Sequence, residues 1–315
     1  MRDLFTLPFW RKKSGKDWER VISGCGAASC AGTRALWQRF TRRQCGTCLD
    51  GVLYCGPQCL EPALLAQFSR LMALSPPSPP PNRMPLGLLL VARGKLNYTE
   101  VLAGLEAQRS ARGGKIGEWF EKLGFATEQE ITSALALQWG CPVASSLEPD
   151  AIAPPFRLPL AILEKFHMLP LHHVSATNTL SIAFGERVDH AVLYAIEKML
   201  QCRTQPCVGG RNSVARILDR MHHQPLAREF EFGPMHDAAD MVRIASSYIT
   251  RFGAEEIRLD RLGPFIWLRL KWRTSIMNLL FRLRIDPPQA RSTKVALLPL
   301  PYGRLPDIEE IHAGE

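Results

Sequence analysis

The chain has 315 residues, of which 46% are hydrophobic and 22% are charged, and its formal net charge is +9. This composition is typical of globular proteins, and the length predicts two or three domains. No apolar run approaches the roughly 18 residues that a membrane-spanning helix needs, and the first residues lack the pattern of a secretory signal. The sequence therefore predicts a cytoplasmic protein without a transmembrane segment.

Residues 1–74 form the first predicted domain and carry most of the excess positive charge. They contain 11 Lys and Arg against 5 Asp and Glu, so they would attract an acidic partner. Residues 75–84, which include the run SPPSPPPN, are predicted to be a linker because proline favours extended polyproline II. The basic charge makes nucleic-acid binding through residues 1–74 one alternative function.

Six of the nine cysteines lie between positions 25 and 59. In a chain without an export signal, such a cluster indicates metal binding rather than disulfides. Two pairs, spaced C-x2-C and C-x3-C, flank a predicted Asp-Gly hairpin turn and predict one structural Zn2+ held by four thiolates. The predicted ligands are Cys45, Cys48, Cys55 and Cys59.

Cys25 and Cys30 are separated by four residues and have two interpretations. Either they replace one of the two pairs, or they complete a second site. The stretch CGTCLDGVLYCGPQC resembles treble-clef and ribbon zinc fingers that end in Tyr-Cys-x-x-x-Cys. The first domain is therefore predicted to be a small basic zinc finger.

Residues 85–138 contain a tandem repeat with an offset of 30 residues, in which PLGLLLVARGKLNYTEVLAGLEAQ is followed by KIGEWFEKLGFATEQEITSALALQ. Five positions are identical between the copies: Gly87/Gly117, Gly94/Gly124, Glu100/Glu130, Leu105/Leu135 and Gln108/Gln138. Each copy predicts a short helix that ends at its second glycine, because glycine tolerates a left-handed backbone. A second helix then begins at a capping box, made by Asn97 with Glu100 or by Thr127 with Glu130. Two such hairpins predict a four-helix unit.

The tandem pattern LG…G…L…Q resembles the N-terminal, MshE-type domain of type II secretion and type IV pilus assembly ATPases. The likeness covers residues 85–221, and the family binds cyclic di-GMP through its two motif copies. The resemblance implies one half-site at Leu86, Gly87, Leu90, Gly94, Leu105 and Gln108. It implies a second half-site at Lys115, Ile116, Gly117, Phe120, Gly124, Leu135 and Gln138.

In these implied half-sites the Leu and Phe side chains pack against guanine faces, and the Gln amides hold the ligand. Lys115 would pair with a phosphate or with a guanine acceptor edge. The sequence departs from the family at Pro85, where the family has a basic residue, although Arg83 is close. The spacer of residues 109–114 is also one residue longer than usual.

Residues 139–221 are predicted to form a small α/β subdomain. Strands are predicted at HMLPLHHV, TLSIAFG and TQPCVGG, and helices at DHAVLYAIEKML and NSVARILDRM, the second capped by Asn212 or Ser213. The stretch resembles the α/β subdomain that follows the repeat in the MshE-type family. Asp189 would match an acidic residue of one of its turns.

Residues 222–315 are predicted to be an α+β segment. An amphipathic helix that ends at Gly253 is predicted at AADMVRIASSYITRFG. Two strands around a Gly-Pro turn are predicted at EEIRLDRLGPFIWLRLKW. The stretch KWRTSIMNLLFRLRI is basic and amphipathic. It is expected to be a helix with one solvated face and one apolar face in the core, with docking on acidic lipid as the alternative. The segment resembles a degenerate form of the domain that precedes the motor in the secretion ATPases.

The chain is thus predicted to be an α+β multidomain protein. No Gly-rich phosphate loop with Lys-Ser or Lys-Thr occurs in the sequence, so an ATPase motor is not expected. The resemblance implies a non-enzymatic cyclic di-GMP sensor or adaptor, with a protein partner in a secretion or pilus assembly. The alternatives are a nucleic-acid-binding zinc-finger protein and a ligand-free docking scaffold.

Overall fold

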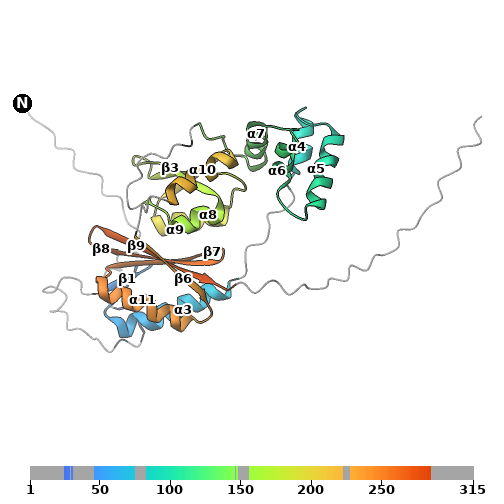
Figure 1. Cartoon of the computed structure of the whole chain (residues 1–315). Helices are drawn as coiled ribbons and strands as arrows, with labels where there is room; N and C mark the ends of the chain where they lie inside the picture. Colours follow the sequence, from blue (N-terminus) through green and yellow to red (C-terminus); the bar gives the residue numbers. More distant parts are fainter. Residues whose placement is uncertain are drawn as a thin grey trace, which may run out of the picture. The chain divides into compact units, whose positions relative to one another are not determined.

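The computed structural model describes residues 25–28, 30, 46–74, 83–145, 147, 156–222 and 228–284 (Figure 1). Among these residues no helix is long and apolar enough to cross a membrane. The first elements are the strands β1 (Thr47–Leu49) and β2 (Val52–Tyr54) and the helix α3 (Pro57–Ala73). The tandem repeat follows as α4 (Leu86–Ala92), α5 (Tyr98–Ser110), α6 (Ile116–Lys122) and α7 (Glu128–Trp139).

The repeat forms the predicted four helices, and its two copies match in detail. Gly94 and Gly124 have φ angles of +66° and +72° just after α4 and α6, so each ends its short helix in the left-handed conformation. Both predicted capping boxes are present at the starts of α5 and α7. The core between the helices is built around Leu90 and Phe120, which are fully buried.

The α/β subdomain contains α8 (Leu160–Phe166), β3 (Met168–Val174), β4 (Thr179–Phe184), α9 (His190–Leu200), β5 (Arg203–Val208) and α10 (Arg211–His222). Its sheet has the order β3-β4-β5, with β3 antiparallel and β5 parallel to β4. Asp189 caps α9 by accepting from two backbone N–H groups of its first turn. The three predicted strands and two predicted helices are confirmed. Helix α10 begins at Arg211, however, so the prediction of a cap at Asn212 or Ser213 is wrong.

The last described elements are β6 (Arg228–Met235), α11 (Ala238–Phe252), β7 (Glu256–Leu262), β8 (Phe265–Trp272) and β9 (Ser275–Leu283). They form a six-stranded sheet of order β2-β1-β7-β8-β9-β6, in which β1 is parallel to β7. Gly253 ends α11 with a φ of +61°, as predicted. The Asp50-Gly51 turn between β1 and β2 is also present, and both residues have positive φ angles.

Strands from the first and from the last described segments of the chain pair in this one sheet. Helices α3 and α11 lie on the same face of the sheet (Figure 1) and share one hydrophobic core with it. In that core Phe68 of α3 meets Phe281 of β9 edge to face, with ring centroids 5.4 Å apart. The sequence predicted separate domains at 1–74 and 222–315, whereas residues 46–74 and 228–284 share one sheet. A sequence cannot show this pairing because it joins segments about 200 residues apart.

The stretch from Lys271 to Ile285, which was expected to be an amphipathic helix, is instead mostly strand. Residues Ser275–Leu283 form β9, which lies between β8 and β6 in the sheet. Most of its side chains are buried, and Asn278 accepts a 2.9 Å hydrogen bond from the indole N–H of Trp267. The helical prediction was wrong because a strand that is buried on both faces shows no period of two.

Candidate functional site

A cavity of about 740 Å³ lies between the helical repeat and the α/β subdomain. From the repeat it is lined by the starts of α4 and α6 and by one side of α7. From the subdomain it is lined by the end of α8, residues 185–189 and the first residue of α10. Of the thirteen predicted ligand-binding residues, the cavity brings together Leu86, Lys115, Ile116, Gly117, Leu135 and Gln138.

The other predicted ligand-binding residues do not line this cavity: Gly87, Leu90, Gly94, Leu105, Gln108, Phe120 and Gly124. Leu90 and Phe120 have no exposed surface, so they hold the four helices together. A Cβ atom on Gly87 would lie 3.0 Å from a methyl carbon of Val101, so this glycine allows α4 and α5 to approach closely. The two copies are alike in fold, but they contribute unequally to the cavity.

Basic side chains from both parts of the chain meet at the cavity wall. Lys115 pairs with Glu186, and Arg211 pairs with Glu118 and, at 3.0 Å, with the same Glu186. Arg187 pairs with Asp189 at 3.0 Å. Each of these cations already has a carboxylate partner, so an anionic ligand has to compete with carboxylates for them.

Burial and neighbouring charge act on the titration of this cluster. Burial lowers the pKa of Lys115 below its ordinary value, and the nearby Arg211 lowers it further. Burial, followed by the charges of Arg211 and Lys115, also lowers the pKa of His167. Burial and like charges therefore both disfavour the protonated, charged forms of Lys115 and His167.

Two equivalent hydrogen bonds connect the end of each copy of the repeat to the residue before the other copy. The side-chain amide of Gln108 donates to the carbonyl oxygen of Gly114 at 2.8 Å, and that of Gln138 donates to the carbonyl oxygen of Met84 at 2.7 Å. Each glutamine at the end of one copy therefore binds the residue that precedes the other copy. Only Gln138 reaches the cavity.

Arg83, which was noted as a nearby basic residue for the first half-site, is engaged elsewhere. Its guanidinium lies 3.8 Å from the centre of the Trp139 ring and donates to the carbonyl oxygen of Gln138 at 2.6 Å. Arg83 therefore packs on the end of α7 and is not among the residues that line the cavity.

The sequence did not assign Glu186, Arg187 and Arg211 to the site. They lie 48 to 73 residues beyond the end of the repeat at Gln138, on a short connection and at a helix start. No periodic pattern marks such positions, because their proximity depends on how the subdomain packs against α7. Asp189, which the resemblance matched to an acidic turn of the subdomain but did not assign to the site, also lines the cavity.

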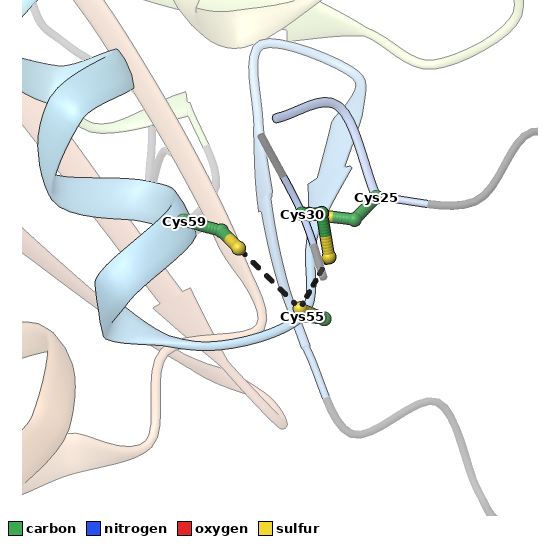
Figure 2. Close-up of side chains that lie close together, drawn as sticks. All are labelled: Cys25, Cys30, Cys55 and Cys59. Atoms are coloured by element: carbon green, nitrogen blue, oxygen red, sulfur yellow. Dashed lines mark hydrogen bonds between the residues drawn. The ribbon is translucent and has the colours of Figure 1, made fainter. Parts of the chain in front are cut away.

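The predicted zinc ligands are distributed differently from the expectation. Cys55 and Cys59 lie beside Cys25 and Cys30, and the sulfur atoms of these four residues are all within 4.8 Å of one another (Figure 2). Cys48 lies on β1 and is not part of this group. Cys45 is outside the described residues, as is most of the basic sequence of residues 1–45 that motivated the nucleic-acid alternative.

No protein-family model and no curated protein matches the chain significantly. Among solved structures, the chain is similar to a structure of MshE with cdg, at 26% identity and a TM-score of 0.37, over 44% of this chain and 99% of that chain. It is also similar to two crystal forms of the N-terminal domain of XpsE, at 19% and 20% identity and TM-scores of 0.34 and 0.28. These cover 43% and 42% of this chain and 92% and 90% of those chains. The predicted similarity to an MshE-type N-terminal domain is thus found over a little under half of the chain.

Proposed function

We propose that this protein is a non-enzymatic sensor that binds cyclic di-GMP in the cavity between the repeat and the α/β subdomain. The observation that carries the proposal is the composition of the cavity wall. It combines motif positions of the repeat, among them Lys115 and Gln138, with the cations Arg187 and Arg211 of the subdomain. A ligand with two phosphates and two planar bases needs both kinds of contact.

The cavity wall offers a suitable group for each part of such a ligand. Leu86, Ile116 and Leu135 provide apolar surface against which a guanine ring can pack. Lys115 and Arg211 provide charge for phosphate, and a guanidinium binds phosphate oxygens in a bidentate manner. The cavity volume of about 740 Å³ is within the range of small-molecule sites in proteins, which is about 300 to 1,000 Å³.

Binding would also change how the two parts of the chain are joined. The ion pairs Lys115–Glu186 and Arg211–Glu118 connect the repeat to the subdomain across the cavity. A phosphate that takes over Lys115 and Arg211 replaces these links with its own. The ligand then shifts the population between two arrangements of the repeat and subdomain. The partner that senses this shift is proposed to be a protein of a type II secretion or type IV pilus-like system.

Calorimetric titration of cyclic di-GMP into the full chain tests the proposal, with GMP as the matched control. We expect saturable binding of one cyclic dinucleotide per chain and no comparable heat with GMP. A thermal shift measured with the same two ligands gives a second readout. If neither heat nor a thermal shift appears with cyclic di-GMP, the repeat is a docking scaffold without this ligand, and the proposal is wrong.

A further inference from the structure

The four grouped cysteines come from two separate segments of the chain. Cys25 and Cys30 are at the two ends of a short turn, in which the Cys30 N–H donates to the carbonyl oxygen of Ala27 at 3.1 Å. Cys55 directly follows β2, and Cys59 lies in the first turn of α3. The N–H of Cys59 donates to the carbonyl oxygen of Gly56 at 3.1 Å, and the Cys59 sulfur points toward that of Cys55 (Figure 2).

The sulfur separations fit a single tetrahedral metal ion. The Cys30–Cys55 and Cys55–Cys59 sulfur distances are both 3.6 Å. A tetrahedral ion with Zn–S bonds of about 2.3 Å places its sulfur ligands about 3.8 Å apart. A disulfide needs a sulfur separation of about 2.05 Å, and all four cysteines are free. The group is therefore arranged as four ligands and not as two disulfides.

A backbone hydrogen bond brings the first segment against the second, and none of its described residues, 25–28 and 30, belongs to a buried hydrophobic cluster. The N–H of Gly26 donates to the carbonyl oxygen of Leu53 on β2 at 2.8 Å. A Cβ atom on Gly26 would lie 2.2 Å from a methyl carbon of Val52, so a larger residue there would have to displace the Val52 side chain. Small segments of this kind are commonly held in place by a metal ion, because they bury too little apolar surface.

We infer that Cys25, Cys30, Cys55 and Cys59 bind one structural Zn2+ that fastens residues 25–28 and Cys30 to the edge of the six-stranded sheet. Four thiolates fill the tetrahedral coordination of zinc and leave no open position for a substrate, so the role is structural. The ligand spacing is C-x4-C followed by C-x3-C, which replaces the predicted pair Cys45 and Cys48. The inference is independent of the nucleotide proposal, because the zinc ligands and the cavity share no residue.

The zinc site lies at the edge strand β2, so the ion is expected to stabilise the six-stranded sheet. Strand β2 is at one edge of the sheet, and its neighbour β1 pairs with β7. An unprotected edge strand is a template for aggregation, and the metal-bound segment lies along this one. Removal of zinc should therefore destabilise the sheet shared by residues 46–74 and 228–284, while the repeat keeps its helices.

Elemental analysis of the purified full chain tests the ligand set. We expect about one zinc per chain in the wild type and in the double variant Cys45→Ser/Cys48→Ser. We expect the metal to be lost from Cys25→Ser/Cys30→Ser, which removes half of the proposed ligands. A wild-type chain with no zinc, or with iron in its place, overturns the inference. Retention of zinc by Cys25→Ser/Cys30→Ser overturns it equally.

A second measurement on the wild-type chain does not depend on whether the variants fold. Native protein is alkylated with and without a zinc chelator, and the modified cysteines are mapped by mass spectrometry. We expect Cys25, Cys30, Cys55 and Cys59 to be protected together and to become reactive together when the chelator is present. If Cys45 and Cys48 respond to the chelator and Cys25 and Cys30 do not, the inferred ligand set is wrong.

Discussion

The side-chain amide of Gln138 binds the carbonyl oxygen of Met84, 54 residues earlier in the chain, at 2.7 Å. The equivalent bond in the other half of the repeat, from Gln108 to Gly114, is 2.8 Å long. The two acceptors are themselves 30 residues apart, like the two donors. The final glutamine of each copy thus has a structural role in the chain as it stands, in addition to any contact with a ligand.

This equivalence allows the structural and ligand-binding roles of Gln138 to be separated. Gln108→Ala and Gln138→Ala each remove one exposed side-chain hydrogen bond, so each should lower the free energy of unfolding by about 1 kcal/mol. Only Gln138 lines the cavity, so only Gln138→Ala should weaken cyclic di-GMP binding. Chemical denaturation and calorimetry measure the two effects. Equal loss of affinity in both variants would show that Gln138 acts only through stability.

The carboxylate of Glu186 pairs with both Lys115 and Arg211, so under the proposed function it would compete with a ligand phosphate for these two cations. Glu186→Gln should therefore increase the affinity for cyclic di-GMP several-fold. Lys115→Ala should lower it about tenfold, which corresponds to about 1.4 kcal/mol. Titration of each variant at low and at moderate salt checks these expectations, since the charge contribution decreases as salt increases.

A weaker affinity in Glu186→Gln would contradict this account. It would show that Glu186 holds Lys115 and Arg211 in position for the ligand and does not compete with it. Glu106, an exposed glutamate of α5 that is not part of the cavity, gives the matched control. Glu106→Gln removes the same charge from the chain and should leave the affinity unchanged.

Gly104 packs directly against the ring of Phe120 in the core of the repeat. A Cβ atom at Gly104 would lie 2.5 Å from a ring carbon of Phe120, so Gly104→Ala should cost about 1 to 3 kcal/mol of stability. In the other copy the matching positions are Ala134 and the smaller Leu90. The double variant Gly104→Ala/Phe120→Leu should therefore recover part of the loss in thermal unfolding.

Gly113→Ala is the control for this pair, because a Cβ atom there meets nothing within 4 Å. If Gly104→Ala is as stable as Gly113→Ala, the core of the repeat is looser than the structure indicates. If the double variant is less stable than Gly104→Ala, the two positions do not compensate for each other.

Phe68 provides a test of the shared sheet. It is fully buried against Phe281 and the rest of the sheet core, so Phe68→Ala should cost about 3 to 5 kcal/mol. Hydrogen exchange should show the loss of protection in β7, β8 and β9, more than 180 residues away in sequence. Leu65→Ala, on the exposed side of the same helix, should leave these strands protected. Normal protection in Phe68→Ala would mean that α3 does not belong to this sheet.

The capping box at Glu130 predicts a pH dependence of the repeat. Hydrogen bonding to the Thr127 backbone, and then to Lys95, lowers the pKa of Glu130 from 4.5 to about 2. A carboxylate with a lowered pKa in the folded state stabilises the fold above its unfolded value, and this contribution is lost as the pH falls toward the folded value. The cap should therefore weaken between pH about 4.5 and about 2.

Nuclear magnetic resonance titration of the Glu130 carboxyl carbon checks this window. Lys95→Ala removes the ion pair of 3.0 Å with Glu130 and should raise the pKa of Glu130. The backbone bond of Thr127 remains in this variant, so the pKa should stay below its ordinary value. A titration midpoint near the ordinary value in the wild-type protein would contradict the capping geometry.

The repeat could be predicted from the sequence because its signals are local. Gly94 and Gly124 end helices, and Asn97 and Thr127 begin them, through backbone conformation and hydrogen bonds within four residues. Such interactions form in the same way wherever the segment lies in the fold. A match between two copies, 30 residues apart, then makes each local signal more reliable.

The candidate sites could be predicted only in part, because they are assembled across the fold. Glu186 and Arg211 reach Lys115 through the packing of the subdomain on the repeat, and Cys25 reaches Cys55 through a bond from Gly26 to Leu53. The pairing of β1 with β7 and the pairing of β6 with β9 likewise depend on contacts between segments far apart in sequence. The sequence by itself determined the repeat, its caps and the presence of a cysteine cluster. Only the tertiary structure decided which charges line the cavity and which cysteines meet, because spatial proximity between distant segments leaves no periodic pattern in either of them.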